Sequence, residues 1–125
     1  VIIPYINFEQ FSKKLKKILF NNKITVYGNL IKIFNGEGNG LSFNGRGVCM
    51  NLEILNNKEN IFFFKILDKL VIEYDGISAL YKDSRISIKS IKKQYGKKYF
   101  NFINFIKKND KKNKMKSELS LKLNK

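Results

Sequence analysis

The chain has 125 residues, with 25 Lys and Arg against 10 Asp and Glu, which gives a formal net charge of +15 at pH 7. Its hydrophobic fraction of 43% is ordinary for a globular domain, and its longest apolar stretch is much shorter than a membrane-spanning helix. It contains no histidine and one cysteine, which excludes imidazole catalysis, histidine-bound metals and an internal disulfide. The composition predicts one small domain with a polyanion as partner, and neither an enzyme nor a cofactor-binding or metal-binding protein.

The first predicted element is an amphipathic helix over residues 7–20. Phe8, Phe11 and Leu15 recur at the helical period, and lysines occupy the opposite face. Asn7 and Gln10 are spaced as a capping pair. The lysine face suits a phosphate backbone or an anionic lipid surface, and an ordinary solvated helix face explains it equally well.

From residue 24 the hydrophobic pattern changes to a period of two, which predicts β-strands. Val48, Met50, Leu52 and Ile54 alternate with polar residues, and five glycines in residues 35–47 predict a loop or a glycine-interrupted hairpin. The strands are expected at 24–34, 48–54, 61–67, 70–74, 77–81 and 85–92, with one long bent strand as the alternative for 61–74. Several short strands after one helix indicate a mainly β protein with a small barrel. We expect an N-terminal helix or arm at 1–23, a barrel body at 24–106 and a basic tail at 107–125. Residues 99–106 fit a strand and a helix equally well.

The positive charge is concentrated near the C-terminus. Residues 1–81 carry a net charge of +3 and residues 82–125 carry +12. Around Gly96 the lysines alternate with aromatic residues, a pattern in which ammonium groups meet phosphates and rings stack on bases. Core packing is the plainer interpretation for Phe100, Phe102 and Phe105. The segment predicts a basic arm on RNA that contains Lys92, Lys93, Lys97, Lys98, Lys107, Lys108, Lys111, Lys112, Lys114 and Lys116.

The order of these features resembles the family of the nineteenth large-subunit protein of bacterial-type ribosomes. Ile88 and Ile91 match its I-x-x-I strand, Gly96-Lys97 its Gly-Lys turn, and residues 103–107 its L-Y-Y-L-R motif. Further matches are Ser84-Arg85-Ile86 with its S-P-R-I, residues 22–31 with its N-K-x-R-I segment, and residues 110–116, including Asn113 and Met115, with its basic tail.

This resemblance implies an SH3-like barrel and a structural role in the ribosomal large subunit. The partners would be ribosomal RNA and neighbouring ribosomal proteins, with no small-molecule substrate and no membrane contact. Arg46 and Arg85 would bind phosphates bidentately beside the lysines of the basic arm. The bias toward Lys, Asn and Ile indicates an AT-rich genome, which favours a mitochondrial ribosome, or alternatively a plastid-type one.

Two other functions remain open from the sequence. One is an OB-type protein that binds single-stranded nucleic acid, with Tyr27, Phe34, Tyr95 and Tyr99 as a stacking platform. The other is a structural subunit of a membrane-associated organellar complex, in which the helix at 7–20 lies on anionic lipid.

Overall fold

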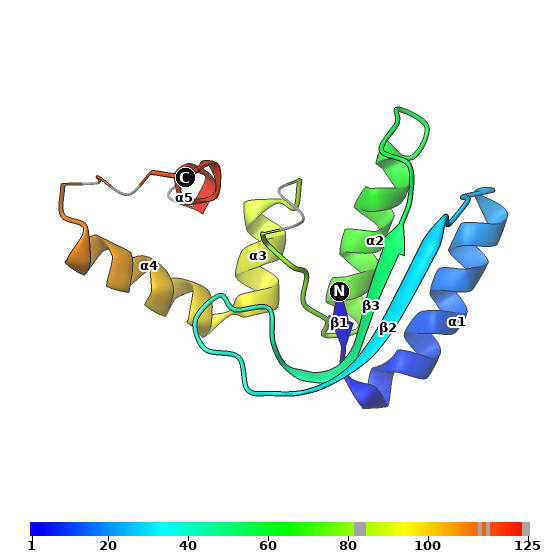
Figure 1. The fold of residues 1–125 in the computed structure, drawn as a ribbon, viewed down its shortest axis with the longest axis horizontal. Helices are drawn as coiled ribbons and strands as arrows, with labels where there is room; N and C mark the ends of the chain where they lie inside the picture. The colour runs from blue at the N-terminus through cyan, green and yellow to red at the C-terminus, as the bar shows by residue number, and fades with distance from the viewer. Residues whose placement is uncertain (82–84, 113, 115, 124–125) are drawn as a thin grey trace.

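The computed structural model describes residues 1–81, 85–112, 114 and 116–123, and Figure 1 shows how their helices and strands are arranged. The elements are β1 (Ile2–Ile3), α1 (Tyr5–Asn21), β2 (Gly28–Asn35), β3 (Arg46–Glu53), α2 (Ile61–Glu73), α3 (Ile88–Tyr95), α4 (Lys97–Asn109) and α5 (Glu118–Leu123). The described residues are 48% helical and form a mixed α/β protein with one small open antiparallel sheet. The predicted mainly β class and the SH3-like barrel are therefore wrong.

The sheet has the strand order β1–β3–β2, and both pairs are antiparallel. β2 and β3 pair along their whole length, from Gly28 with Glu53 to Asn35 with Arg46. Ile2 of β1 pairs with Cys49 of β3 and, at its other edge, shares two backbone hydrogen bonds with Ile77, at 2.8 and 2.9 Å. The strand predicted at 77–81 is thus reduced to one bridge.

Helices α1 and α2 cover one face of this sheet. Phe11 and Leu15 of α1 and Phe63 of α2 are buried in one cluster with Ile3 and Met50 from the strands. Each large apolar side chain buried in this way contributes about 1.5–3 kcal/mol relative to leaving it exposed. This cluster holds the sheet and the two helices together.

The helix predicted at 7–20 is confirmed as α1, with two more residues at its start and one at its end. Its predicted cap is wrong, because Pro4 is the N-cap residue and no side chain caps the helix. The Asn7 amide donates instead to the carbonyl oxygen of Tyr74, at 3.1 Å. Asn7 therefore connects the first turn of α1 to the end of α2.

The strands predicted at 61–67 and 70–74 are wrong, since these residues form the single helix α2. Phe63, Leu67, Leu70 and Val71 are its buried residues, and their spacing of three to four residues places them on one side of a helix. Nine of the 13 residues of α2 are apolar, and short apolar runs fit a buried strand and a buried helix equally well. Packing against α1 and the sheet decides for the helix.

The C-terminal third forms a second core. Ile91 and Tyr95 of α3, Tyr99 of α4 and Leu123 of α5 are buried together. The strand predicted at 85–92 is wrong, because Ser87 caps α3 by accepting a hydrogen bond from the Ser90 amide at 3.1 Å. Residues 99–106 belong to α4, and the tail at 107–125 includes the end of α4 and the packed helix α5. None of the described helices is long and apolar enough to cross a membrane.

Candidate functional site

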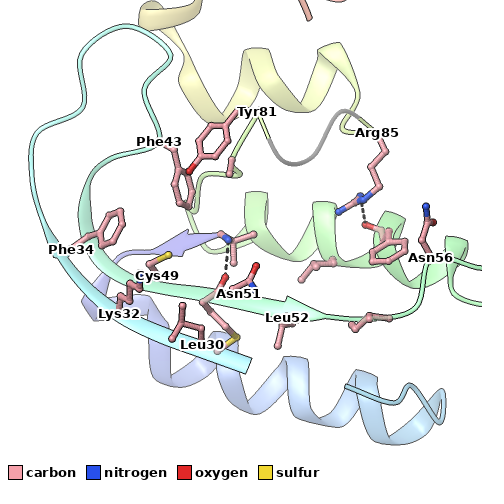
Figure 2. Close-up of a pocket in the computed structure, with 16 residues that line it drawn as sticks. Leu30, Lys32, Phe34, Phe43, Cys49, Asn51, Leu52, Asn56, Tyr81 and Arg85 are labelled. Atoms are coloured by element: carbon pink, nitrogen blue, oxygen red, sulfur yellow. Dashed lines mark hydrogen bonds between the residues drawn. The ribbon is translucent and has the colours of Figure 1, made fainter. Parts of the chain in front are cut away.

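A cleft lies between the sheet and α2, which contributes Phe64 and Leu67 to its lining, and Figure 2 shows the residues around it. Leu30, Lys32 and Phe34 alternate along β2, and the register pairs Leu30 with Asn51 and Lys32 with Cys49. Because alternate residues of a strand point to the same face, these five side chains project together. All five line the cleft, whose volume of about 530 Å³ lies within the range of roughly 300–1,000 Å³ that is typical of small-molecule sites.

An aromatic wall closes one side of the cleft. The rings of Phe34 and Phe43 meet edge to face with their centroids 6.0 Å apart, and those of Phe43 and Tyr81 do so at 6.2 Å. Figure 2 shows Phe43 beside Tyr81 above the strands. The three residues come from β2, the glycine-rich loop and the segment after α2. The three rings are therefore brought into contact only when these separate segments fold together.

Arg85 stands at the other end of the cleft and is bound to α2. Its Nη1 donates to both carboxylate oxygens of Asp68, at 2.9 Å each, and to the Phe64 carbonyl oxygen at 3.3 Å. The guanidinium also lies over the Phe64 ring, 4.6 Å from its centroid. The Asp68 side chain is only 15% exposed. Asp68 thus balances the charge of Arg85, which the sequence assigned to RNA phosphates.

The remaining polar groups of the cleft are the Lys32 ammonium, the Cys49 thiol and the amides of Asn51 and Asn56. Among the described lining residues none has a carboxylate, and the described part of the chain gives Lys32 no ion pair. Across all the residues that the structure describes, no group of three His, Cys, Asp or Glu side chains could hold a metal ion. The cleft thus combines an aromatic wall with the exposed Lys32 ammonium, while the Arg85 guanidinium is paired with Asp68.

Two of the four tyrosine and phenylalanine residues proposed as a stacking platform are in the core. Tyr95 and Tyr99 are 6% and 4% exposed, and their hydroxyls donate to the carbonyl oxygens of Ser78 and Leu123, at 2.8 and 2.7 Å. Burial, reinforced by the charge of Tyr81, raises the pKa of Tyr95 to about 12. Neither ring is free to stack on a base.

The predicted RNA-binding lysines are all exposed. Two also make contacts within the fold. Lys98 Nζ donates to the Gly38 carbonyl oxygen at 2.6 Å, and Lys92 Nζ lies 5.5 Å from the centre of the Tyr99 ring. Around the junction of α3 and α4 stand Lys92, Lys93, Lys97 and Lys98; Lys107 and Lys108 are in the last turn of α4; and Lys111, Lys112, Lys114 and Lys116 follow before α5.

Arg46 is exposed at the first position of β3 and lines a small pocket together with Lys98. The structure therefore brings these two predicted residues together, and it places Arg85 apart from them in its pair with Asp68. Ser84, Asn113 and Met115, which contributed to the ribosomal resemblance, lie outside the described residues.

Sequence reasoning missed the cleft residues Lys32, Asn51 and Tyr81. The alternation through Val48 and Met50 already implied that residues 49 and 51 share the opposite face of their strand. Their position beside Lys32 depends on the register of β2 against β3, for which the sequence contains no signal.

Comparison with models of known protein families finds no match to this chain, and comparison with curated protein sequences finds none either.

Proposed function

We propose that this chain binds a small organic molecule in the cleft between the sheet and α2. The observation that carries the proposal is the convergence of Lys32, Cys49 and Asn51 beside the aromatic wall formed by Phe34 and Phe43. A pocket that is largely apolar, with a few polar groups directed into it, is the usual form of a ligand site.

The lining indicates the chemistry of the ligand. Its body is aromatic or aliphatic, since it meets Leu30, Phe34 and Phe43. It has one anionic group, because Lys32 is exposed and no described lining residue has a carboxylate. Covering ~100 Å² of apolar surface yields about 2.5 kcal/mol, and one exposed charge pair adds ~0–1 kcal/mol. The aromatic wall therefore supplies most of the affinity and Lys32 selects the charge.

Titration of the ¹⁵N-labelled protein with benzoate and with neutral benzyl alcohol tests this proposal. We expect both probes to shift the amide signals of Cys49, Asn51 and Tyr81, with benzoate binding more tightly. Lys32→Met removes the cation and keeps an apolar stem, so it is expected to weaken benzoate binding three- to tenfold and to leave benzyl alcohol unchanged. Lys89→Met, which changes an exposed lysine of α3, is the matched control. Shifts confined to α3 and α4, or an equal effect of both variants, would contradict the proposal.

The exposed lysines favour a second candidate function, binding of ribosomal RNA as a structural constituent of an organellar large subunit. The support is that all ten predicted lysines are exposed over α3, α4 and the segment before α5. The fold lacks the barrel that the ribosomal resemblance implied, so this candidate depends on the lysines alone. The mitochondrial or plastid location stays a prediction.

Migration with large ribosomal subunits in a sucrose gradient tests the second candidate. Lys107→Gln/Lys108→Gln/Lys111→Gln is expected to release the protein from the particles. It should also lower the salt dependence of RNA binding by about 0.7–0.9 for each phosphate that a lysine no longer neutralises. A protein found only as a free pool would contradict this candidate and would leave the benzoate titration unaffected.

A further inference from the structure

A shallow groove lies at the C-terminal end of α1, away from the cleft. In Figure 1 this end of α1 is on the opposite side of the molecule from α4 and α5. Lysines surround the groove and apolar side chains form its floor. The residues that line it are Lys13, Lys16, Lys17, Leu19, Phe20, Lys23, Ile24 and Thr25.

The chain reversal after α1 positions Lys23 in this groove. The Ile24 amide donates to the Leu19 carbonyl oxygen at 2.9 Å and the Lys23 amide to that of Phe20 at 3.1 Å, a pair of bonds that closes the helix as a Schellman motif. Lys23 has the left-handed φ of 52° that this motif requires and that glycine usually supplies. The strained residue is thus a cation that stands beside the lysines of α1.

The groove is positively charged. Lys13 is paired with Glu9 at 2.6 Å, whereas the described residues provide no ion pair for Lys16, Lys17 or Lys23. All four lysines are exposed, and none of the described lining residues is acidic. A partner that complements this groove must therefore carry several negative charges, spread widely enough for the lysine ammonium groups to contact them together.

Phe20 adds an apolar component that a phosphate backbone does not use. It is 83% exposed beside the half-buried Leu19 and Ile24. A large aromatic side chain in water next to several cations matches the surface of an anionic bilayer. The headgroups there accept the lysines, and the acyl boundary lies within reach of an inserted ring.

We propose that the end of α1 docks on an anionic lipid bilayer, with Phe20 inserted and Lys16, Lys17 and Lys23 on the headgroups. This contact is peripheral and independent of the ligand cleft. The sequence left anionic lipid open as one surface for the lysine face of this helix, and the structure adds Phe20 and Lys23 at its end.

Vesicles of phosphatidylcholine, with and without 30% phosphatidylglycerol, test the proposal. The chain contains no tryptophan, so Phe20→Trp places a fluorescent reporter at the proposed insertion point. We expect its emission to shift to the blue with the anionic vesicles and to stay unshifted with neutral vesicles. Phe20→Ser and the triple variant Lys16→Gln/Lys17→Gln/Lys23→Gln are each expected to weaken binding to the anionic vesicles at least tenfold.

Matched controls separate this surface from the general basic charge. Lys107→Gln/Lys108→Gln/Lys111→Gln removes the same charge from the C-terminal region, and Phe105→Ser removes another exposed aromatic ring, which is 61% exposed. Both controls are expected to change vesicle binding less than threefold. The proposal is overturned if the control variants lose as much binding as the α1 variants. It is equally overturned if single-stranded oligonucleotides, and not the vesicles, shift the tryptophan emission of the Phe20→Trp protein.

Discussion

Asp68 in α2 and Arg85 in the segment before α3 form the most enclosed ion pair found in the described residues, with Nη1 at 2.9 Å from each carboxylate oxygen. The pair joins the two cores of the molecule, since α2 belongs to the first and Ile86, the neighbour of Arg85, to the second. It also fixes one end of the cleft.

Asp68→Asn is expected to lower the free energy of unfolding by about 1–2 kcal/mol, because Arg85 would lose its charge-assisted hydrogen bonds to the Asp68 carboxylate. Urea denaturation measures the change. Lys13→Gln, which breaks the fully exposed pair with Glu9, is the control and is expected to leave the midpoint unchanged. Equal shifts for the two variants would refute a special role for the Asp68–Arg85 pair.

Gly47→Ala is expected to destabilise the sheet by about 2 kcal/mol or more. A Cβ at this position would lie 2.2 Å from the Ile3 carbonyl oxygen, so β1 and β3 would have to separate. Thermal denaturation and hydrogen exchange at the Met50 amide, which donates to Val1, report this separation. Gly45→Ala provides the comparison, since its nearest contact would be at 3.9 Å. A milder effect at residue 47 than at residue 45 would disprove the close approach.

Lys23→Gly is expected to stabilise the fold by about 1 kcal/mol, because glycine adopts the left-handed conformation without steric cost. The same variant should bind anionic vesicles more weakly, so stability and lipid binding would move in opposite directions. Asn22→Gly, at a neighbouring residue with a φ of −99°, has no strain to relieve and is expected to lower stability. An unchanged or lower unfolding midpoint for Lys23→Gly would contradict the strained geometry.

The pKa of Tyr95 predicts an alkaline limit to stability. Its pKa is about 12 in the fold against ~10 in the unfolded chain. Between these two pKa values Tyr95 ionises in the unfolded chain and stays neutral in the fold, which favours unfolding. The contribution of neutral Tyr95 to the free energy of unfolding is therefore complete below pH ~10 and is lost as the pH rises toward 12. Denaturation midpoints measured from pH 9 to 11.5 should fall less steeply for Tyr95→Phe. A parallel slope in both proteins would show that Tyr95 does not cause the fall.

Tyr99→Phe is expected to loosen α5, because the buried hydroxyl of Tyr99 donates to the Leu123 carbonyl oxygen. Leaving that carbonyl unpaired costs about 1–3 kcal/mol. Hydrogen exchange in residues 118–123 should accelerate while exchange in α1 stays the same. Tyr27→Phe, at a side chain that is 70% exposed, should have no such effect. Unchanged exchange in α5 would indicate that the apolar contact of Leu123 suffices to hold it.

The elements predicted correctly are those whose hydrophobic period is unambiguous. Phe11 and Leu15 repeat with a helical spacing against lysines, and Val48 and Met50 alternate with more polar residues, so α1 and β3 were found with small errors at their ends. In α2 nine of the 13 positions are apolar, and they do not follow one clear period. Leu67 and Leu70 then fit either structure, and only their packing against α1 selects the helix.

Of the two candidate sites, one could be recognised from the sequence and the other could not. The exposed lysines could be recognised from sequence, because charge seldom enters a core. The cleft could not, since it depends on the register that sets Lys32 beside Cys49 and on Phe43 and Tyr81 meeting across the molecule. The pairing of Arg85 with Asp68 could not be predicted either, because it depends on how the segment before α3 packs against α2.

By itself the sequence determined the charge, its concentration after residue 82, and the elements with a clear local period. These properties depend on neighbours within a few residues, which the chain order specifies. The tertiary structure decided the identity of α2, the second core, the internal pairing of Arg85 and the cleft between the sheet and α2. Each of these depends on contacts between residues far apart in the sequence, where burial and register outweigh local preference.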